Sequence, residues 1–323
     1  MIALSRLLAV LLLTLVTGTP LLAAEEEGDK NPLASMPLRH IGPAITSGRI
    51  SDFAFYPGGD HEFLAGISSG NLFRTTNGGI TWDAIFENEG SYAIGVVELD
   101  PNNSNTIWVG TGENNAQRSV AAGDGVYKST DGGKSWTNVG LEDSGHISQI
   151  WINPDDSDEV LVASQGPLWS DGGDRGLYRT LDGGDSWERI LDVDEHTGIN
   201  EFVVDPRNPD VIVASSYQRR RHVWVLINGG PGSGIHKTTD RGKTWTKVSA
   251  GLPSDHMGRI GLAGAPSNPD MIYAIIEAND DEKGIYRTTD FGSNWEKQSS
   301  YMTTSPQYYN EIVVDPKNSE RLY

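Results

Sequence analysis

The chain has 323 residues, a formal net charge of −19, 38 glycines, nine tryptophans and no cysteine. The charge argues against nucleic acid or an anionic membrane surface as a partner, and the missing cysteine excludes disulfides and a thiol nucleophile. Stability must therefore come from packing, in a chain whose glycine content indicates many turns.

Residues 1–24 have the pattern of a secretory signal peptide, because Arg6 precedes an apolar run, Leu7–Val16, that is too short to span a bilayer comfortably. Cleavage after residue 24 would place Leu22, which is not small, three positions before the cut, so an uncleaved anchor is the alternative. We expect a secreted or periplasmic protein that keeps no membrane span after cleavage, with residues 25–37 as a polar tether.

One octapeptide, [ST]-x-[DN]-x-G-x-x-W, then recurs at steps of 50 to 58 residues, a period typical of propeller blades. Its five copies span Thr75–Trp82, Ser129–Trp136, Thr180–Trp187, Thr238–Trp245 and Thr288–Trp295. A proline turn keeps the same period, as in Asp100-Pro101-Asn102 and Asp205-Pro206-Arg207, and lies between two β-rich runs.

Each repeat therefore predicts a four-stranded antiparallel blade: strand one, proline turn, strand two, a variable loop, strand three, the octapeptide turn and strand four. Such sheets are apolar on both faces and stack on one another, with the tryptophans filling the gaps. The predicted fold class is an all-β propeller over residues 38–323, with five complete blades and the start of a sixth. Leu38–Pro43 aligns with a fourth strand, and the chain stops at Tyr323 within the second strand of blade six, so we expect a longer parent protein.

With these motifs the chain resembles the Asp-box (BNR-repeat) β-propeller superfamily. It is most similar to large bacterial secreted proteins described as sortilin N-terminal-domain-like or glycosyl-hydrolase-like, and shares Ile41-Gly42-Pro43, Gly48-Arg49-Ile50 and Gln165–Trp169 with them. The resemblance covers nearly everything from Leu38 onward. It implies the propeller fold but no particular reaction.

The Asp-box residues themselves are predicted to be structural, because Asn77 replaces the aspartate in one copy and a turn needs only a short acceptor side chain. This structural set is Asn77, Trp82, Asp131, Trp136, Asp182, Trp187, Asp240, Trp245, Asp290 and Trp295. The sialidase-type Arg-Ile-Pro motif is not reproduced. The position of the catalytic aspartate in similar xyloglucanases falls on Ser68, which cannot act as the acid or base of glycoside hydrolysis.

Insertions between strands two and three concentrate at one end of the blades, at residues 111–125, 164–176 and 216–234. Arginine and tryptophan in these loops, with residues where the blades begin, are typical of surfaces that bind carboxylates, sugars or peptides. The candidate ligand-binding residues are Arg49, Glu113, Asn114, Arg118, His146, Gln165, Trp169, His196, Arg219, Arg221, His222, Arg259, Tyr308 and Tyr309. The alternative is that the arginines pair with local acids and hold the loops.

The sequence predicts no catalytic residue, metal ligand or cofactor. The glycine-rich run at 229–234 lacks the Lys-Ser/Thr of a phosphate loop, and repeated histidines such as His146 and His196 follow from duplication. We therefore expect a non-catalytic recognition propeller for a peptide, protein or glycan. The alternatives are a glycoside hydrolase-like enzyme acting on polysaccharide, and a scaffold or assembly factor. Open sheet edges also predict self-association.

Overall fold

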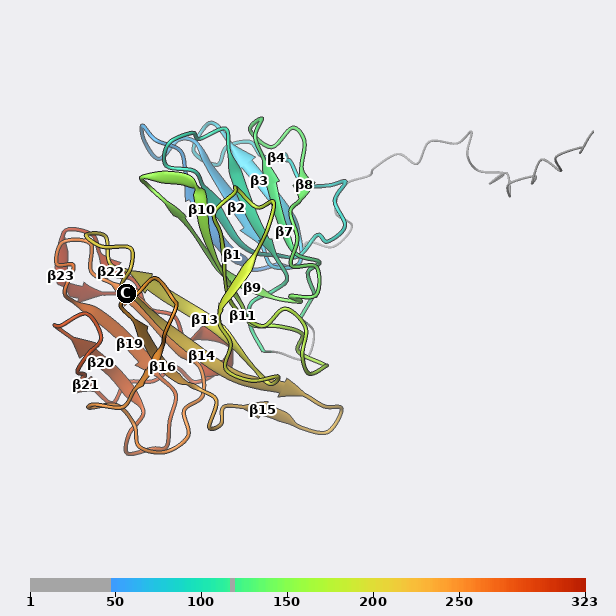
Figure 1. Cartoon of the computed structure of the whole chain (residues 1–323). Coiled ribbons are helices and arrows are strands. Elements are labelled where there is room, and N and C mark those ends of the chain that lie inside the picture. The colour runs from blue at the N-terminus through green and yellow to red at the C-terminus, as the bar shows by residue number, and fades with distance from the viewer. Residues whose placement is uncertain (1–47, 117–119) are drawn as a thin grey trace, which may run out of the picture. The chain divides into compact units, whose positions relative to one another are not determined.

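The computed structural model describes residues 48–116 and 120–323, which form successive antiparallel sheets and one four-residue helix, α2 (Pro306–Tyr309) (Figure 1). The predicted signal peptide and tether, and Leu38–Pro43, lie outside the described residues. Among the described residues, no helix is long and apolar enough to cross a membrane.

Five sheets are complete blades and a sixth has two strands, as the repeat predicted. Blade one has β1 (Ile50–Phe55), β2 (Phe63–Ile67), β3 (Asn71–Thr75) and β4 (Asp83–Ala84), and blade two has β5 (Ile94–Leu99), β6 (Ile107–Thr111), β7 (Val126–Ser129) and β8 (Thr137–Asn138). Blade three has β9 (Ile147–Asn153), β10 (Asp156–Ser164), β11 (Gly176–Thr180) and β12 (Glu188–Leu191). Blade four has β13 (Thr197–Val204), β14 (Ile212–Arg221), β15 (Leu226–Asn228), β16 (Gly234–Thr238) and β17 (Thr246–Val248). Blade five has β18 (Ile260–Gly264), β19 (Ile272–Ile276), β20 (Gly284–Thr288) and β21 (Glu296–Ser299), and blade six has β22 (Val314–Asp315) and β23 (Asn318–Leu322).

The Asp-box closes the turn between the third and fourth strands of each blade. In blade two, Asp131 Oδ1 accepts the backbone N–H of Ser135 at 2.9 Å, while Ser129 Oγ donates to Asp131 and accepts the N–H of Gly133. The hydrogen bonds from Ser135 hold the pKa of Asp131 at about 2. In blade one, Asn77 Oδ1 accepts the equivalent N–H of Thr81 at 2.9 Å, so the amide fills the same structural position.

The motif also joins each blade to the next. In blades two, three and four the tryptophan that ends the box donates its indole N–H, at 2.7 Å, to a carbonyl on the fourth strand of the preceding blade or just beyond it: Trp136 to Ile85, Trp187 to Val139 and Trp245 to Ile190. The basic residue on each third strand reaches the other way, to the carbonyl at the fourth box position of the following blade. These pairs are Arg74 to Gly132, Lys128 to Gly183, Arg179 to Arg241 and Lys237 to Phe291, at 2.7 to 3.3 Å.

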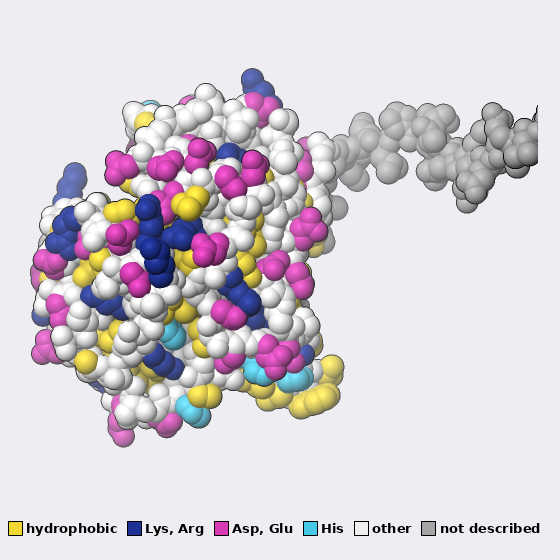
Figure 2. All heavy atoms as spheres, viewed as in Figure 1, with side chains coloured by type: hydrophobic (Ala, Val, Ile, Leu, Met, Phe, Trp, Pro, Cys, Tyr) yellow, Lys and Arg dark blue, Asp and Glu magenta, His cyan; other side chains and the backbone are white. Residues whose placement is uncertain are grey.

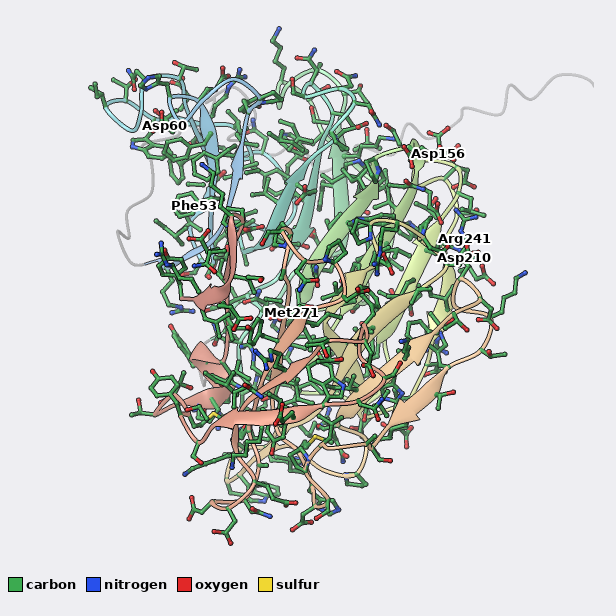
Figure 3. All side chains as sticks on the ribbon, turned by 90° about the vertical axis from the view of Figure 1, so that its left-hand side faces the viewer. Phe53, Asp60, Asp156, Asp210, Arg241 and Met271 are labelled. Carbon is green, nitrogen blue, oxygen red and sulfur yellow. The ribbon has the colours of Figure 1, made fainter. Side chains whose placement is uncertain are left out.

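The first strands carry a third kind of link between blades. Asp52, Gln149 and Glu201 occupy equivalent positions, and each accepts a backbone N–H from the first strand of the following blade: Val97 at 2.9 Å, Phe202 at 2.7 Å and Leu262 at 2.5 Å. The hydrophobic clusters lie between the blades, with Trp108 the largest fully buried side chain. Arg241 adds an ion pair from blade four to Glu159 of blade three, with its Nε 3.9 Å from Asp210 Oδ1 (Figure 3).

One of these links gives a direct stability test. The Lys128 ammonium donates to Gly183 O at 2.9 Å and lies 4.8 Å from the centroid of the Trp108 ring. Lys128→Met keeps the apolar stem and is expected to lower the free energy of unfolding by about 1 to 2 kcal/mol, the contribution of one charged hydrogen bond and a cation–π contact. Urea denaturation followed by tryptophan fluorescence measures the change. Lys134→Met, at an exposed position in the neighbouring Asp-box, is the control; equal stability of the two variants would contradict the assignment.

Candidate functional site

The first group of candidate residues lies where the blade-two insertion meets other blades. Arg49 forms an ion pair with the buried carboxylate of Glu113, and its guanidinium lies 4.5 Å from the centroid of the Tyr308 ring. Gln165 donates to the carbonyl of Asn114 at 3.2 Å and to Asn200 Oδ1 at 2.6 Å. These bonds join blade one, the blade-two insertion, blades three and four and the start of blade six.

The predicted arginines connect the same segments. Arg219 is fully buried and donates to the carbonyls of Asn115 at 3.1 Å and Gly166 at 3.4 Å. Arg259, also buried, donates to Gln307 O at 3.3 Å and pairs with Glu311 at 3.2 Å. Gln307 O also accepts the backbone N–H of Ala116, so residues 113–116 and 307–311 are joined directly, and each segment is also held by a buried guanidinium group. This arrangement matches the alternative in which arginines hold the loops.

The remaining predicted residues separate into buried and exposed positions. His146 is buried, and burial lowers its pKa well below the usual value, so its ring is neutral. His196 is partly exposed, with Nδ1 3.0 Å from Asp171 Oδ1, and Trp169 is half exposed. Arg118 lies outside the described residues, and the side chain of Tyr309 is not among those that the structure describes. No group of three His, Cys, Asp or Glu within the described part is placed to hold a metal ion.

The blade-four insertion differs from the loop that we expected over residues 216–234. Strand β14 continues through Arg221, and β15 pairs with it from Leu226 to Asn228, so the segment is a hairpin. The reason is local composition, because Val223–Ile227 contains three β-branched residues and a tryptophan. At its tip the rings of His222 and Trp224 stack, with centroids 5.7 Å apart.

A polar groove lies beside this hairpin, where blades four, five and six are connected. It consists of two adjoining pockets of about 300 and 640 Å³ that share Glu277 and Ala278, and we call it the Glu277 groove. Its further lining residues include Asn228, His256, Asp280, Lys283, Tyr301 and Thr303. The lining comes from loops at the ends of β15, β17, β19 and β21.

Glu277 is held in the groove by three hydrogen bonds. Both of its carboxylate oxygens accept from Asn228 Nδ2 at 2.9 Å, and Oε2 also accepts the backbone N–H of Arg259 at 3.0 Å. Burial raises the pKa of Glu277, whereas the bond from Lys283 lowers the pKa of Asp280. The other segment that lines the larger pocket, Ser300–Thr304 and Pro306, contains no acidic residue. Both carboxylates of the groove therefore belong to one loop.

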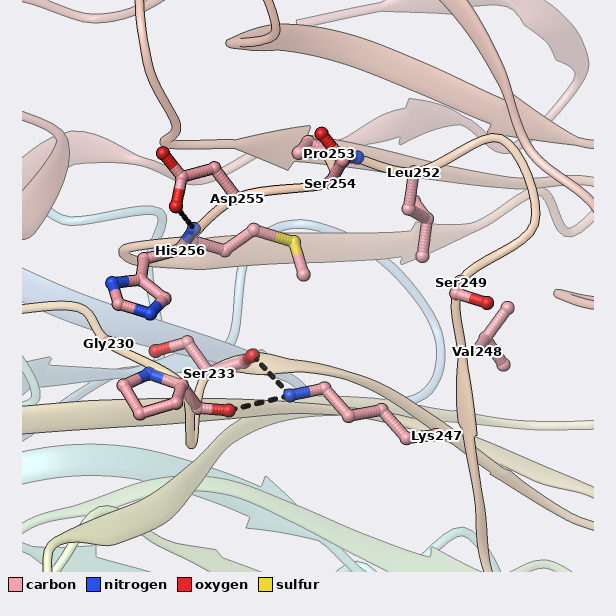
Figure 4. A pocket seen from close by; sticks show the side chains of 12 residues that line it. Gly230, Ser233, Lys247, Val248, Ser249, Leu252, Pro253, Ser254, Asp255 and His256 are labelled. Atoms are coloured by element: carbon pink, nitrogen blue, oxygen red, sulfur yellow. Dashed lines mark hydrogen bonds between the residues drawn. The ribbon is translucent and has the colours of Figure 1, made fainter.

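An apolar pocket of about 530 Å³ adjoins the groove at Gly230, His256 and Met257 (Figure 4). Val248, Leu252, Pro253 and Met257 provide its apolar lining, and we call it the Leu252 pocket. The Lys247 ammonium points to the carbonyls of Pro231 at 2.7 Å and Ser233 at 2.9 Å, and is therefore already bonded. The exposed Ser254, Asp255 and His256 form the polar rim.

The sequence had not indicated Glu277, Asn228, Tyr301 or the Leu252 pocket. Glu277 carried a usable signal, since it directly follows the apolar strand β19 and an acid at a strand end is placed to face a loop region. Asn228 and Tyr301 carried none, because each gains its place only through pairing with residues from another blade or connection.

The comparisons with known proteins agree with this architecture. The sequence model of the Sortilin-Vps10 family (Sortilin, neurotensin receptor 3) matches residues 124–230 and 175–322, together more than half of the chain. The xyloglucanase Xgh74A of Acetivibrio thermocellus is 26% identical over 246 residues, which is 66% of this chain and 26% of that protein. The vacuolar protein sorting/targeting protein 10 of Colletotrichum graminicola is 31% identical over 106 residues, 32% of this chain and 6% of that protein.

A solved structure shows the same fold. The crystal structure of an ancestral GH74 enzyme superimposes with a TM-score of 0.64 at 21% identity, over 84% of this chain and 34% of the other. The chain thus spans about a quarter of the length of the xyloglucanase Xgh74A and about a third of the length of the ancestral GH74 enzyme.

Proposed function

This chain belongs to the Sortilin-Vps10 family, and from that membership we propose that it is a secreted recognition propeller that binds an extended peptide, protein segment or glycan in the Glu277 groove without cleaving it. Secretion rests on the signal-peptide pattern of residues 1–24. The relatives support ligands of both kinds, since they include xyloglucanases and a protein-sorting factor.

The observation that carries the proposal is the placement of acids in the groove. Glycoside hydrolysis needs two carboxyl groups on opposite sides of the scissile bond, about 5 to 10 Å apart. Here Glu277 and Asp280 lie three residues apart in one loop, and the other lining segment of the larger pocket contributes Tyr301, Met302 and Thr303. A carboxylate held by Asn228, in one groove with the exposed ring of Tyr301, is suited to hydrogen bonding and stacking with a ligand.

Glycoside hydrolysis remains the second candidate, because burial raises the pKa of Glu277 while Asp280 stays ionised, and such a separation of pKa values is typical of acid and base pairs. Ser68, at the position of the xyloglucanase aspartate, is buried and supplies no carboxyl group. Catalysis in the Glu277 groove would have to use Glu277 and Asp280, the two acids among its lining residues.

The test is calorimetric titration of the chain with neurotensin and with a xyloglucan oligosaccharide, together with an assay for new reducing ends. We expect one probe to bind without release of shortened products. Glu277→Gln is expected to weaken that binding by about tenfold or more, because a charged acceptor becomes neutral. Tyr301→Ala should weaken it as well.

Tyr92→Ala, an exposed tyrosine in the connection from blade one to blade two, is the matched control and should bind normally. Release of shortened glycan that disappears in Glu277→Gln would replace the recognition proposal with the hydrolase. Binding that is unchanged in both groove variants would show that the ligand lies elsewhere.

A further inference from the structure

The smaller pocket of the Glu277 groove, about 300 Å³, holds an acidic group without a lysine or arginine to pair with it. Among the described residues that line this pocket, Glu277 is the one acid, and none is a lysine or arginine. The hydrogen bonds to its carboxylate come from neutral donors, the Asn228 amide and the Arg259 N–H. Burial raises its pKa, and the Arg259 guanidinium, which opposes this shift, bonds to Glu311 and to Gln307 O. The charge of Glu277 is therefore only partly compensated.

The hydrogen bonds also indicate where on the carboxylate a ligand can bond. A carboxylate offers about four lone-pair positions. Asn228 Nδ2 uses one on each oxygen, and the Arg259 N–H uses a second one on Oε2, which leaves one on Oε1 within the described part of the chain. Gly258 is needed for this placement, because a Cβ at that position would overlap Oε2. Oε1 is thus the atom of Glu277 that can accept one donor from a ligand in the groove.

The Leu252 pocket continues from this smaller pocket, because Gly230, His256 and Met257 line both. Leu252 and Met257 are buried and belong to the hydrophobic cluster that blades four and five share, so packing fixes the apolar wall. A sugar against this wall would bury hydroxyl groups without partners, which is unfavourable, whereas an aliphatic or aromatic side chain would not. The pocket volume of about 530 Å³ is in the range of sites that enclose a bulky group.

We propose that the ligand of the Glu277 groove is a peptide segment in which a basic side chain bonds to Glu277 Oε1 and a nearby bulky apolar side chain fills the Leu252 pocket. This inference rests on the proposed function and narrows its ligand from peptide or glycan to peptide. The two pockets share a wall, so one ligand can occupy both at once. A neutral glycan supplies neither the charge nor the apolar group.

The strength of the two contacts supports this ligand. A hydrogen bond from a charged donor to a carboxylate is about twice as strong as a neutral one, and an apolar side chain gains affinity from the area that it removes from water. Acidic side chains are also spread over the face seen in Figure 2, around a central group of lysines and arginines, and the net charge is −19. A basic segment is therefore attracted to the molecule as it approaches.

Fluorescence polarisation with labelled peptides tests the proposal. Each peptide is acetylated and amidated and contains one leucine and one arginine among glycine and serine; the two are adjacent in one peptide and further apart in the others. We expect the best of these peptides to lose about tenfold or more in affinity when citrulline, which has the shape of arginine without its charge, replaces the arginine. Alanine in place of the leucine should cost about tenfold as well.

Two variants of the chain locate these contacts. In Glu277→Gln the arginine and citrulline peptides should bind equally, whereas Glu142→Gln, at an exposed glutamate between blades two and three, should keep the preference for arginine. Val248→Thr places a hydroxyl in the apolar wall with little change of volume and should weaken the preference for leucine over alanine. Circular dichroism shows whether each variant is folded, and the comparison of arginine with citrulline on the unmodified chain needs no variant.

The outcomes separate this inference from the proposed function. Equal affinity of the arginine and citrulline peptides for the unmodified chain overturns the inference, as does a preference for arginine that persists in Glu277→Gln. A preference for leucine that is unchanged in Val248→Thr also overturns it. If a xyloglucan oligosaccharide binds and no peptide does, the inference is wrong but the recognition proposal stands. If neither binds, both are wrong.

Discussion

Replacing Arg219 with alanine is expected to lower the free energy of unfolding by about 3 to 5 kcal/mol, the largest effect of any single substitution considered. The side chain is fully buried and joins the blade-two insertion to blades three and four through the carbonyls of Asn115 and Gly166. Alanine would leave both carbonyls without this donor and a cavity between the blades. No ion pair of the described part involves Arg219, and burial lowers its pKa to about 9.

Two further variants separate packing from charge. Arg219→Met keeps most of the volume and removes the buried charge, so it should cost less than alanine, because an unpaired buried cation is itself unfavourable. Arg321→Ala, at an exposed arginine that pairs with Asp315, should change stability by less than about 0.5 kcal/mol. Urea unfolding monitored by circular dichroism measures all three. If the free energy of unfolding of Arg219→Ala equals that of the unmodified chain, Arg219 does not hold the blade-two insertion in place.

The second large effect is a loss of stability as the pH rises from about 5 to 9. Burial raises the pKa of Glu201 to about 8, that of Glu98 to about 8 and that of Asp52 to about 6, each above its unfolded value. An acidic group whose pKa is higher in the folded than in the unfolded state makes its full contribution to stability below its unfolded pKa. That contribution is lost as the pH rises through its folded pKa. For Glu201 alone, the loss is on the order of a few kcal/mol.

Glu201→Gln tests the source of this dependence. The amide still accepts the Leu262 N–H that joins blades four and five but cannot ionise, so stability should fall less between pH 5 and 9. Asp131→Asn is the control: its carboxylate has a pKa of about 2, so its contribution is lost only as the pH falls through that region, and Asn77 fills the same turn position in blade one. If the free energy of unfolding of the unmodified chain does not change between pH 5 and 9, the prediction is wrong.

Most of the fold could be predicted because the information was local and repeated. An Asp-box needs only a short acceptor, a glycine and a tryptophan within eight residues, and five copies at a steady period define five blades. The same short motif supplies the indole donor and the carbonyl that link neighbouring blades, as at Trp136 and Gly132. Strand order follows, since consecutive strands in each blade pair as a meander.

The candidate site could be predicted only in part, because a loop residue's environment depends on other blades. Arg219 and His222 lie three residues apart in one predicted insertion, yet one is fully buried and the other lies at a projecting tip. Glu277 gains its partners from Asn228 in blade four and the backbone of Arg259 in its own blade. No spacing in the sequence reports such contacts.

The sequence by itself determined the class of fold, the number and order of the blades and the structural chemistry of the turns, because each depends on residues close together in the chain. The tertiary structure decided which charged side chains are buried between loops, and where the Glu277 groove and the Leu252 pocket lie. The physical reason is that burial and pocket shape are set by packing between blades, which joins residues more than a hundred positions apart, such as Arg219 and Asn115.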